Sequence, residues 1–242
     1  DDHFHGTHVA GTIAAVGGNG RGVVGVAFES RIMAVKGLDR FGSGAISALF
    51  AAIVYAVDNG ADVINASWGG AGRSQALDDA VAYAHDVGVV FVAAAGNSAA
   101  DAAGFTPANS PGAVVVAASD HLDVRASFSN FGIAIDVTAP GGGDAPPPPD
   151  ARLPVYSVLS LRSSQANTNA FDGGLVVDGD YLRLAGTSMA SPHVAGGAAL
   201  VRAVHPELGV EDIRHILRST ADDVGGPGPD GRDTTNALSY HV

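Results

Sequence analysis

The chain has 242 residues, of which 46% are hydrophobic, and a formal net charge of −12. This length suits one large domain or two small ones with a sizeable core, and no apolar run approaches the ~20 residues that a membrane span needs. The acidic balance excludes the basic footprint of a nucleic-acid-binding protein, and the absence of cysteine excludes disulfides, thiolate zinc sites and a cysteine nucleophile.

Apolar periodicity predicts an alternation of helices and strands through the first half of the chain. In chain order we expect a helix at 8–16, a strand at 31–38, a helix at 44–60, a strand at 62–67, a helix at 74–88, and strands at 89–96 and 113–119. The strands are apolar throughout and alternate with helices, which is typical of a parallel sheet covered on both faces. The expected fold is therefore an α/β three-layer α/β/α sandwich with a mostly parallel sheet.

The second half begins with a segment of different composition. Residues 141–184 start with glycines and four consecutive prolines, which predict a long surface loop. Within it, 155–160 is expected to return to the sheet and 178–184 to form a hairpin arm. Two further helices are expected, at 187–206 and 209–224.

Three histidines, His3, His5 and His8, lie within six residues of one another. Histidine is a competent zinc ligand, and the spacing is that of metallo-β-lactamase-like hydrolases. Those enzymes place Asp directly before the last histidine, where this chain has Thr7, and the other histidines form no second cluster. A metal-dependent hydrolase using His3, His5 and His8 is therefore the weaker alternative, and the favoured interpretation has no metal site.

The segment AGTSMASPH (185–193) favours covalent catalysis instead. It places Ser188 at the start of a helix of small residues, where free N–H groups and the helix dipole stabilise developing negative charge. A serine also needs a neighbouring base, and its oxyanion needs further donors. Asn97, which follows a glycine at the end of an expected strand, offers a carboxamide at the edge where parallel sheets bind ligands.

Several motifs together resemble the subtilisin-like serine proteases, or subtilases (peptidase S8 family). Those that would carry catalysis are HGTHVAG (5–11), AAAGNS (93–98) and GTSMASPHVAG (186–196). Three others occur in the family's order, namely GSG (42–44), DVINASWGG (62–70) and RASFSNFG (125–132). The resemblance covers nearly the whole chain, and it implies one catalytic domain over 1–242 with a long loop at about 141–184.

The resemblance also implies roles for individual residues. It implies a serine endopeptidase that works through an acyl-enzyme, with His5 as general base, Ser188 as nucleophile and Asn97 in the oxyanion hole. Main-chain pairing with an extended peptide would bind the substrate. The substrate-binding residues implied are Gly42, Ser43, Gly44, Ser67, Trp68, Gly69, Ala95 and Gly96. His8 is expected to be a buried structural histidine.

One departure from the family concerns the carboxylate that orients the catalytic imidazole. In the family an Asp at the end of the first sheet strand supplies it, some tens of residues before HGTH, and Asp1 and Asp2 match no such motif. We therefore expect the chain to be N-terminally incomplete and weakly active alone, with open strand edges. A catalytically impaired fragment or pseudoprotease of the same fold is the alternative.

No cofactor is expected for catalysis. Structural calcium is left open, because VGGNGRGVVG (16–25) falls where many family members bind calcium and Asn19 offers an oxygen ligand. The expected partners are a protein or peptide substrate and, in the precursor, an N-terminal propeptide. The protein is expected to be a secreted monomer without nucleic-acid or membrane partners.

Overall fold

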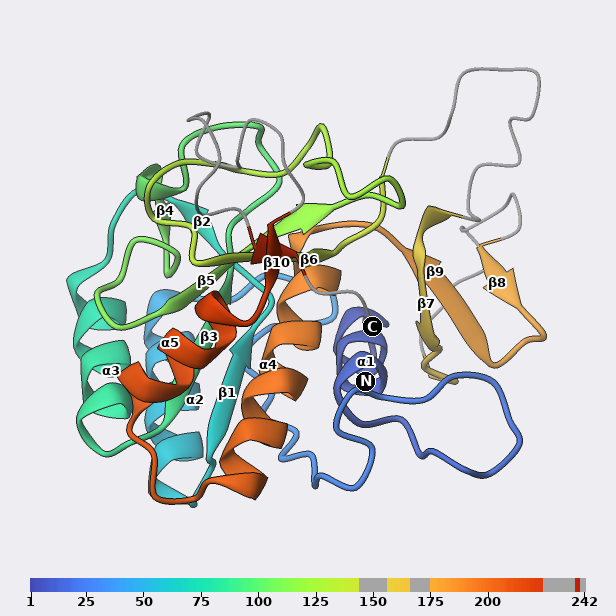
Figure 1. Ribbon diagram of the computed structural model, residues 1–242, viewed down its shortest axis with the longest axis horizontal. Coiled ribbons are helices and arrows are strands. Elements are labelled where there is room, and N and C mark those ends of the chain that lie inside the picture. Colours follow the sequence, from blue (N-terminus) through green and yellow to red (C-terminus); the bar gives the residue numbers. More distant parts are fainter. Residues whose placement is uncertain (144–155, 166–174, 224–237, 240–242) are drawn as a thin grey trace.

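The computed structural model describes residues 1–143, 156–165, 175–223 and 238–239. In this part of the chain a six-stranded sheet with the order β1–β3–β5–β6–β11–β10 forms the centre (Figure 1). Its strands are β1 Val63–Ala66, β3 Val90–Ala94, β5 Val114–Ser119, β6 Val137–Pro140, β10 Asp222–Asp223 and β11 Leu238–Ser239. Neighbouring strands are parallel except for β10 and β11.

Helices cover both faces of this sheet. They are α1 His5–Ala14, α2 Ile46–Asp58, α3 Gln75–Asp86, α4 Thr187–Val204 and α5 Val210–Ser219. Successive side chains of a strand point to opposite faces, so Val90 and Val92 pack in one core with α4 and α5. Phe91 and Ala93 pack in a second core with α2 and α3. The expected three-layer sandwich with a mostly parallel sheet is therefore confirmed.

Two smaller sheets flank the central one. One pairs β2 Gly70–Ala71 with β4 Phe105–Thr106, and the other has the order β7 Val158–Leu161, β9 Tyr181–Leu184, β8 Val176–Val177. The hairpin expected at 178–184 is present as the antiparallel pair β8 and β9. The expected return of 155–160 to the main sheet is wrong, because β7 pairs antiparallel with β9 and packs against α1 instead. A short 3₁₀ helix, η1 Ala102–Gly104, precedes β4.

The strand expected at 31–38 is also not formed. This apolar run has no strand partner, and Ile32 and Met33 are 44% and 41% exposed. Within the described residues β1 is hydrogen-bonded only to β3, so its other edge is unpaired. A strand exists only where a neighbour satisfies its backbone groups. The sequence pattern alone therefore predicted a strand that the described chain does not complete.

The N-terminal helix α1 begins without a capping side chain of its own. The Asp1 carboxylate fills this role, because it accepts hydrogen bonds from the backbone N–H groups of His3, Phe4 and Thr7 at 3.0, 3.3 and 2.7 Å. Figure 1 shows α1 beside α4 and β7, and the two helices are in contact. Within the described ranges, none of the helices combines the length and apolarity that crossing a membrane requires.

Candidate active site

Ser188 is the second residue of α4, and its hydroxyl is held at the end of β1. Its Oγ donates to the Ser67 carbonyl at 3.1 Å, while the Ser67 Oγ donates to the Ser188 carbonyl at 2.8 Å. Asn65 extends this connection by donating from Nδ2 to the Ser67 Oγ at 2.9 Å and accepting from the Ser191 Oγ at 2.6 Å. Four side chains thus fix the first turn of α4 to the carboxyl end of β1, where the sequence placed the chemistry.

The carboxamide of Asn97 lies beside the same helix N-terminus. Its Oδ1 accepts from the Thr187 N–H at 2.8 Å and from the Thr187 Oγ1 at 3.0 Å, which fixes the orientation of the amide. The position that a Cβ would occupy on Gly186 is 3.4 Å from the Asn97 Nδ2 and 3.7 Å from the Ser188 backbone nitrogen. Glycine leaves this position empty, and both nitrogens near it carry N–H groups. Such a pair can stabilise an oxyanion.

His5 lies on α1, which packs against α4. Burial, with a smaller contribution from the neighbouring His3, lowers the pKa of His5 from 6.5 to about 4. Among the described residues no carboxylate forms an ion pair with His5, and His5 and Ser188 share no hydrogen bond. The structure therefore places the two residues on neighbouring helices, with the imidazole neutral at neutral pH and the hydroxyl directed to Ser67.

The other two histidines of the N-terminal cluster point elsewhere. His8 is fully buried with its Nε2 3.0 Å from the Val158 carbonyl oxygen, and burial lowers the pKa of His8 to about 4. The His3 ring stacks on Phe4 with a centroid separation of 4.2 Å and lies 6.3 Å from the His5 ring. No group of three metal-ligating side chains gathers in the described part of the chain. The geometry therefore gives the metal-hydrolase alternative no support.

Part of the expected substrate-binding set lies against the nucleophile helix. Ser67 is bonded to Ser188 as described, and the Gly96 N–H donates to the Thr187 Oγ1 at 3.1 Å. Ala95, Trp68 and Gly69 continue the same two segments. Trp68 packs on the core between α2, α3 and the sheet, and Gly69 sits against the Thr106 carbonyl. The structure thus joins the 67–69 and 95–96 segments to the first turn of α4 through Ser67 and Gly96.

The other residues expected to bind substrate, Gly42, Ser43 and Gly44, lie in a turn rather than in a strand. Asp39 closes this turn: its N–H donates to the Ser43 carbonyl at 2.8 Å, and its Oδ1 accepts from the Ser43 N–H at 3.1 Å. Gly42 has a positive φ of 75°, and a Cβ there would lie 3.1 Å from the His3 ring. Gly44 packs against Gly37. This turn is therefore joined to the histidine side of the site through His3.

The sequence motifs did not identify two residues that lie near the site, Thr187 and Asn130. Thr187 holds the Asn97 amide, and its signal was its place beside Ser188 at a helix N-terminus. Asn130 lies within the motif RASFSNFG (125–132), but the sequence of this motif does not indicate which loop the Asn130 side chain contacts.

The sequence leaves structural calcium open for the segment 16–25. The Asn19 Oδ1 accepts from the Arg21 N–H at 2.9 Å, which closes a local turn. No cluster of acidic or histidine side chains accompanies it in the described residues. The proline run at 146–149 lies outside the described residues.

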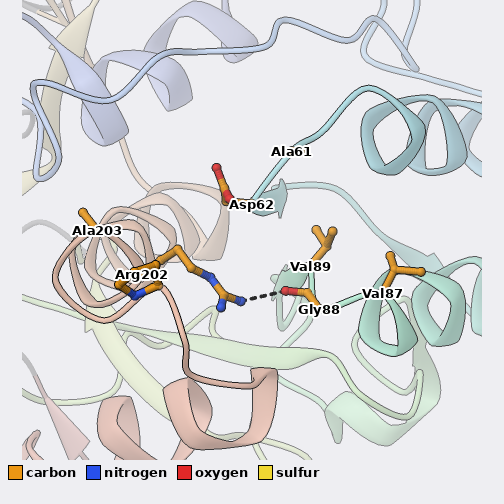
Figure 2. Close-up of a pocket in the computed structure, with 8 residues that line it drawn as sticks. Ala61, Asp62, Val87, Gly88, Val89, Arg202 and Ala203 are labelled. Carbon is orange, nitrogen blue, oxygen red and sulfur yellow. Dashed lines mark hydrogen bonds between the residues drawn. The ribbon is translucent and has the colours of Figure 1, made fainter.

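A hollow of about 510 Å³ lies at the opposite end of the sheet. Figure 2 shows Arg202 reaching from α4 to the Gly88 carbonyl, to which its Nη2 donates at 2.7 Å, while Asp62 points away. The hollow adjoins the amino ends of β1 and β3, whereas ligands of parallel sheets bind at the carboxyl ends. We therefore regard the Arg202 contact as a structural link between α4 and the turn before β3.

Taken together, fold and site define a class: an α/β/α protein with a serine at a helix N-terminus, two amide donors beside it and a histidine on the adjoining helix. Comparison with known proteins gives the particular family. Residues 1–234 match the sequence model of the Subtilase family, Peptidase_S8, and the chain belongs to that family.

Individual relatives agree. The chain is 41% identical over 244 residues to a thermophilic serine proteinase of Bacillus sp. (strain AK1), covering 99% of this chain and 53% of that protein. It is 42% identical over 228 residues to subtilisin DY of Bacillus licheniformis, covering 93% and 73% respectively. The chain thus spans about half the length of the first relative.

Solved structures show the same fold. A protease from Pseudoalteromonas arctica PAMC 21717 superposes with a TM-score of 0.79 at 37% identity, covering 97% of this chain and 67% of that one. A cold-adapted subtilisin-like serine proteinase superposes with a TM-score of 0.79 at 35% identity, covering 100% and 76%.

Proposed function

We propose that this protein is a serine endopeptidase that cleaves peptide bonds through an acyl-enzyme. One observation supports the proposal: the Asn97 Nδ2 and the Ser188 backbone nitrogen both lie close to the space that Gly186 leaves empty, 3.4 and 3.7 Å from the position that a Cβ would occupy. Donors preorganised in this way stabilise the oxyanion of a tetrahedral intermediate. Membership of the subtilase family supports the same reaction.

In the proposed reaction the Ser188 Oγ attacks the substrate carbonyl and its proton passes to the neutral imidazole of His5. To do so, the hydroxyl has to turn away from the Ser67 carbonyl that now accepts its hydrogen bond. The carbonyl oxygen gains negative charge and accepts from the Ser188 N–H and the Asn97 Nδ2. The intermediate then collapses, the amine leaves with the proton from His5, and water releases the acyl group by the same steps.

The substrate would bind as an extended peptide between two segments. In this proposal Gly42, Ser43 and Gly44 would lie on one side of the peptide and Ser67, Trp68 and Gly69 on the other, with Ala95 and Gly96 completing the wall. Backbone pairing of this kind gives affinity without strong dependence on side chains. We further propose one catalytic domain over 1–242 with a long loop at about 141–184, secreted as a monomer from a precursor with a propeptide.

An impaired catalyst of the same fold is the second candidate. It is favoured by a specific observation: no described carboxylate pairs with His5. Asp2 pairs instead with Lys36 at 2.5 Å. In a serine protease with the same type of triad, replacing the Asp by Asn lowers kcat about 10⁴-fold, whereas the oxyanion hole still contributes. This candidate predicts that Ser188 reacts covalently but turns over slowly.

The test is labelling by a fluorophosphonate probe together with hydrolysis of a peptide anilide. We expect the chain to be labelled, Ser188→Ala to lose the label, and Ser98→Ala, an exposed serine of the neighbouring loop, to keep it. Labelling with only trace hydrolysis would favour the impaired catalyst. Labelling that survives Ser188→Ala, or hydrolysis abolished by a chelator alone, would contradict the proposed function.

A further inference from the structure

One buried side chain holds the loop that carries Asn97 from behind. Asn130 is fully buried, and its Nδ2 donates to the Ala95 carbonyl at 2.8 Å. Its Oδ1 accepts from the N–H groups of Ser98 and Ala100 at 2.9 and 3.1 Å. A single carboxamide therefore fixes backbone groups on both sides of Asn97.

The backbone around Asn130 strengthens the same contact. The Asn130 N–H donates to the Gly96 carbonyl at 2.9 Å, and the Ala99 N–H donates to the Phe128 carbonyl at 2.9 Å. Residues 95–100 thus lie along 128–131 for their whole length. The side chain of Asn130 occupies the space between the two segments, where the loop leaves β3.

The chemistry of this contact admits few other side chains. The carboxamide uses one N–H as donor and both acceptor positions of its oxygen, a combination that aspartate and apolar residues lack. The loop also presses closely on it: Gly96 has a φ of 102°, and a Cβ there would lie 2.5 Å from the Asn130 Nδ2. Only glycine fits at position 96.

Asn97 is thereby held at two points. Thr187 fixes its Oδ1, as described above, and Asn130 fixes the backbone from which its side chain projects. An oxyanion donor works only within about 2.7–3.1 Å of the developing charge, and a displacement of about 1 Å can cost about 10²-fold in rate. We propose that Asn130 is a positioning residue for the reaction, which acts through Asn97 and touches no substrate itself. This inference rests on the proposed protease function.

The test is a double-mutant cycle of Asn130→Ala and Asn97→Ala. KM is measured for each variant, and kcat is calculated from the concentration of active sites found by titration. Asn97→Ala is expected to lower kcat by about 10²–10³-fold, a range taken from the equivalent change in a related subtilisin. Asn130→Ala is expected to lower kcat about tenfold with KM unchanged. In the Asn97→Ala background it should change kcat by less than about twofold, because the group it positions is gone.

Two further variants separate positioning from stability. Asn130→Asp keeps an acceptor for Ser98 and Ala100 but loses the donor to Ala95, so its kcat should lie between those of the wild type and Asn130→Ala. Arg214→Gln weakens the fold at Asp136, and Arg214 has no described hydrogen bond to residues 95–100 or to Asn130, so this variant should leave kcat per active site unchanged. Equal losses of kcat from Asn130→Ala in both backgrounds, or an effect on KM alone, would overturn the inference while the protease function stands. A wild-type chain that neither labels nor hydrolyses would overturn both.

Discussion

The low pKa of His5 predicts an unusual pH dependence of catalysis. A general base works only as the neutral imidazole, so activity is present above its pKa and lost as the pH falls through it. Burial, with a smaller contribution from His3, lowers the pKa of His5 from 6.5 to about 4. The reaction of Ser188 should therefore persist well into mildly acidic solution.

The size of the effect follows from the two pKa values. At about pH 5.5 a histidine with the ordinary pKa is roughly one-tenth neutral, whereas one with a pKa near 4 is almost entirely neutral. As a fraction of its own high-pH plateau, the rate at this pH should thus be about tenfold higher than for an ordinary base. His3→Gln should move the acid limb upward by a small amount, because burial is the larger cause of the shift.

The assay is the rate at which a fluorophosphonate labels Ser188 between about pH 4 and 8, alongside kcat/KM for a peptide anilide, which reports the free enzyme. Circular dichroism at each pH controls for unfolding. An acid limb between about pH 6 and 7 would refute the reasoning. It would mean that a carboxylate pairs with His5, since a neighbouring negative charge raises the pKa of an imidazole.

Three other predictions concern stability and the triad. The pKa of His8 is lowered from 6.5 to about 4, so the folded state should be fully stable above pH 6.5 and lose about 3 kcal/mol of unfolding free energy as the pH falls toward 4. In urea unfolding, His8→Gln should lack most of this loss. An equal loss in the variant and the wild type would refute the prediction. Arg214→Met should cost up to about 3 kcal/mol, because Asp136 is 3% exposed and loses its hydrogen bonds from the Arg214 Nε and Nη2 at 2.8 and 3.0 Å. Among the described residues, its carboxylate then keeps only the Val115 N–H at 2.9 Å and the Arg218 Nη1 at 3.4 Å. Asp136→Asn should cost less, since the freed guanidinium can reach water; the reverse order in denaturant unfolding would contradict this account. Asp2→Asn should leave the labelling rate unchanged, because Asp2 pairs with Lys36; loss of labelling would identify Asp2 as the carboxylate that serves His5.

Much of the fold could be predicted because the burial of helices and strands produces a regular spacing of apolar residues in the sequence. The unbroken apolar run at 89–96 predicted β3, which is buried on both faces. The helix expected at 44–60 is present as Ile46–Asp58, and Gly60, whose φ is 81°, directly follows its C-cap residue Asn59. Strand β6, at 137–140, was not predicted, because four residues within a mixed segment give no clear period.

The errors arose where a partner strand decides the outcome. Residues 31–38 have the composition of a buried strand, yet the described chain offers them no neighbour to bond. β7 was expected in the main sheet and instead pairs with β9. Strand pairing joins residues that are distant in sequence, so local composition cannot specify which edge a strand will join.

The sequence by itself determined the layered architecture and the candidates for the reacting groups, because hydrophobic period and short motifs are local properties. Only the tertiary structure decided that Asn130 braces the loop of Asn97, that Thr187 orients its amide, and that no described carboxylate serves His5. The hydrogen bond from Ser98 to Asn130 joins residues that are 32 positions apart, and the one from Thr187 to Asn97 joins residues that are 90 positions apart. Both depend on how the elements pack. They form only after the whole chain has brought the partners within about 3 Å of each other.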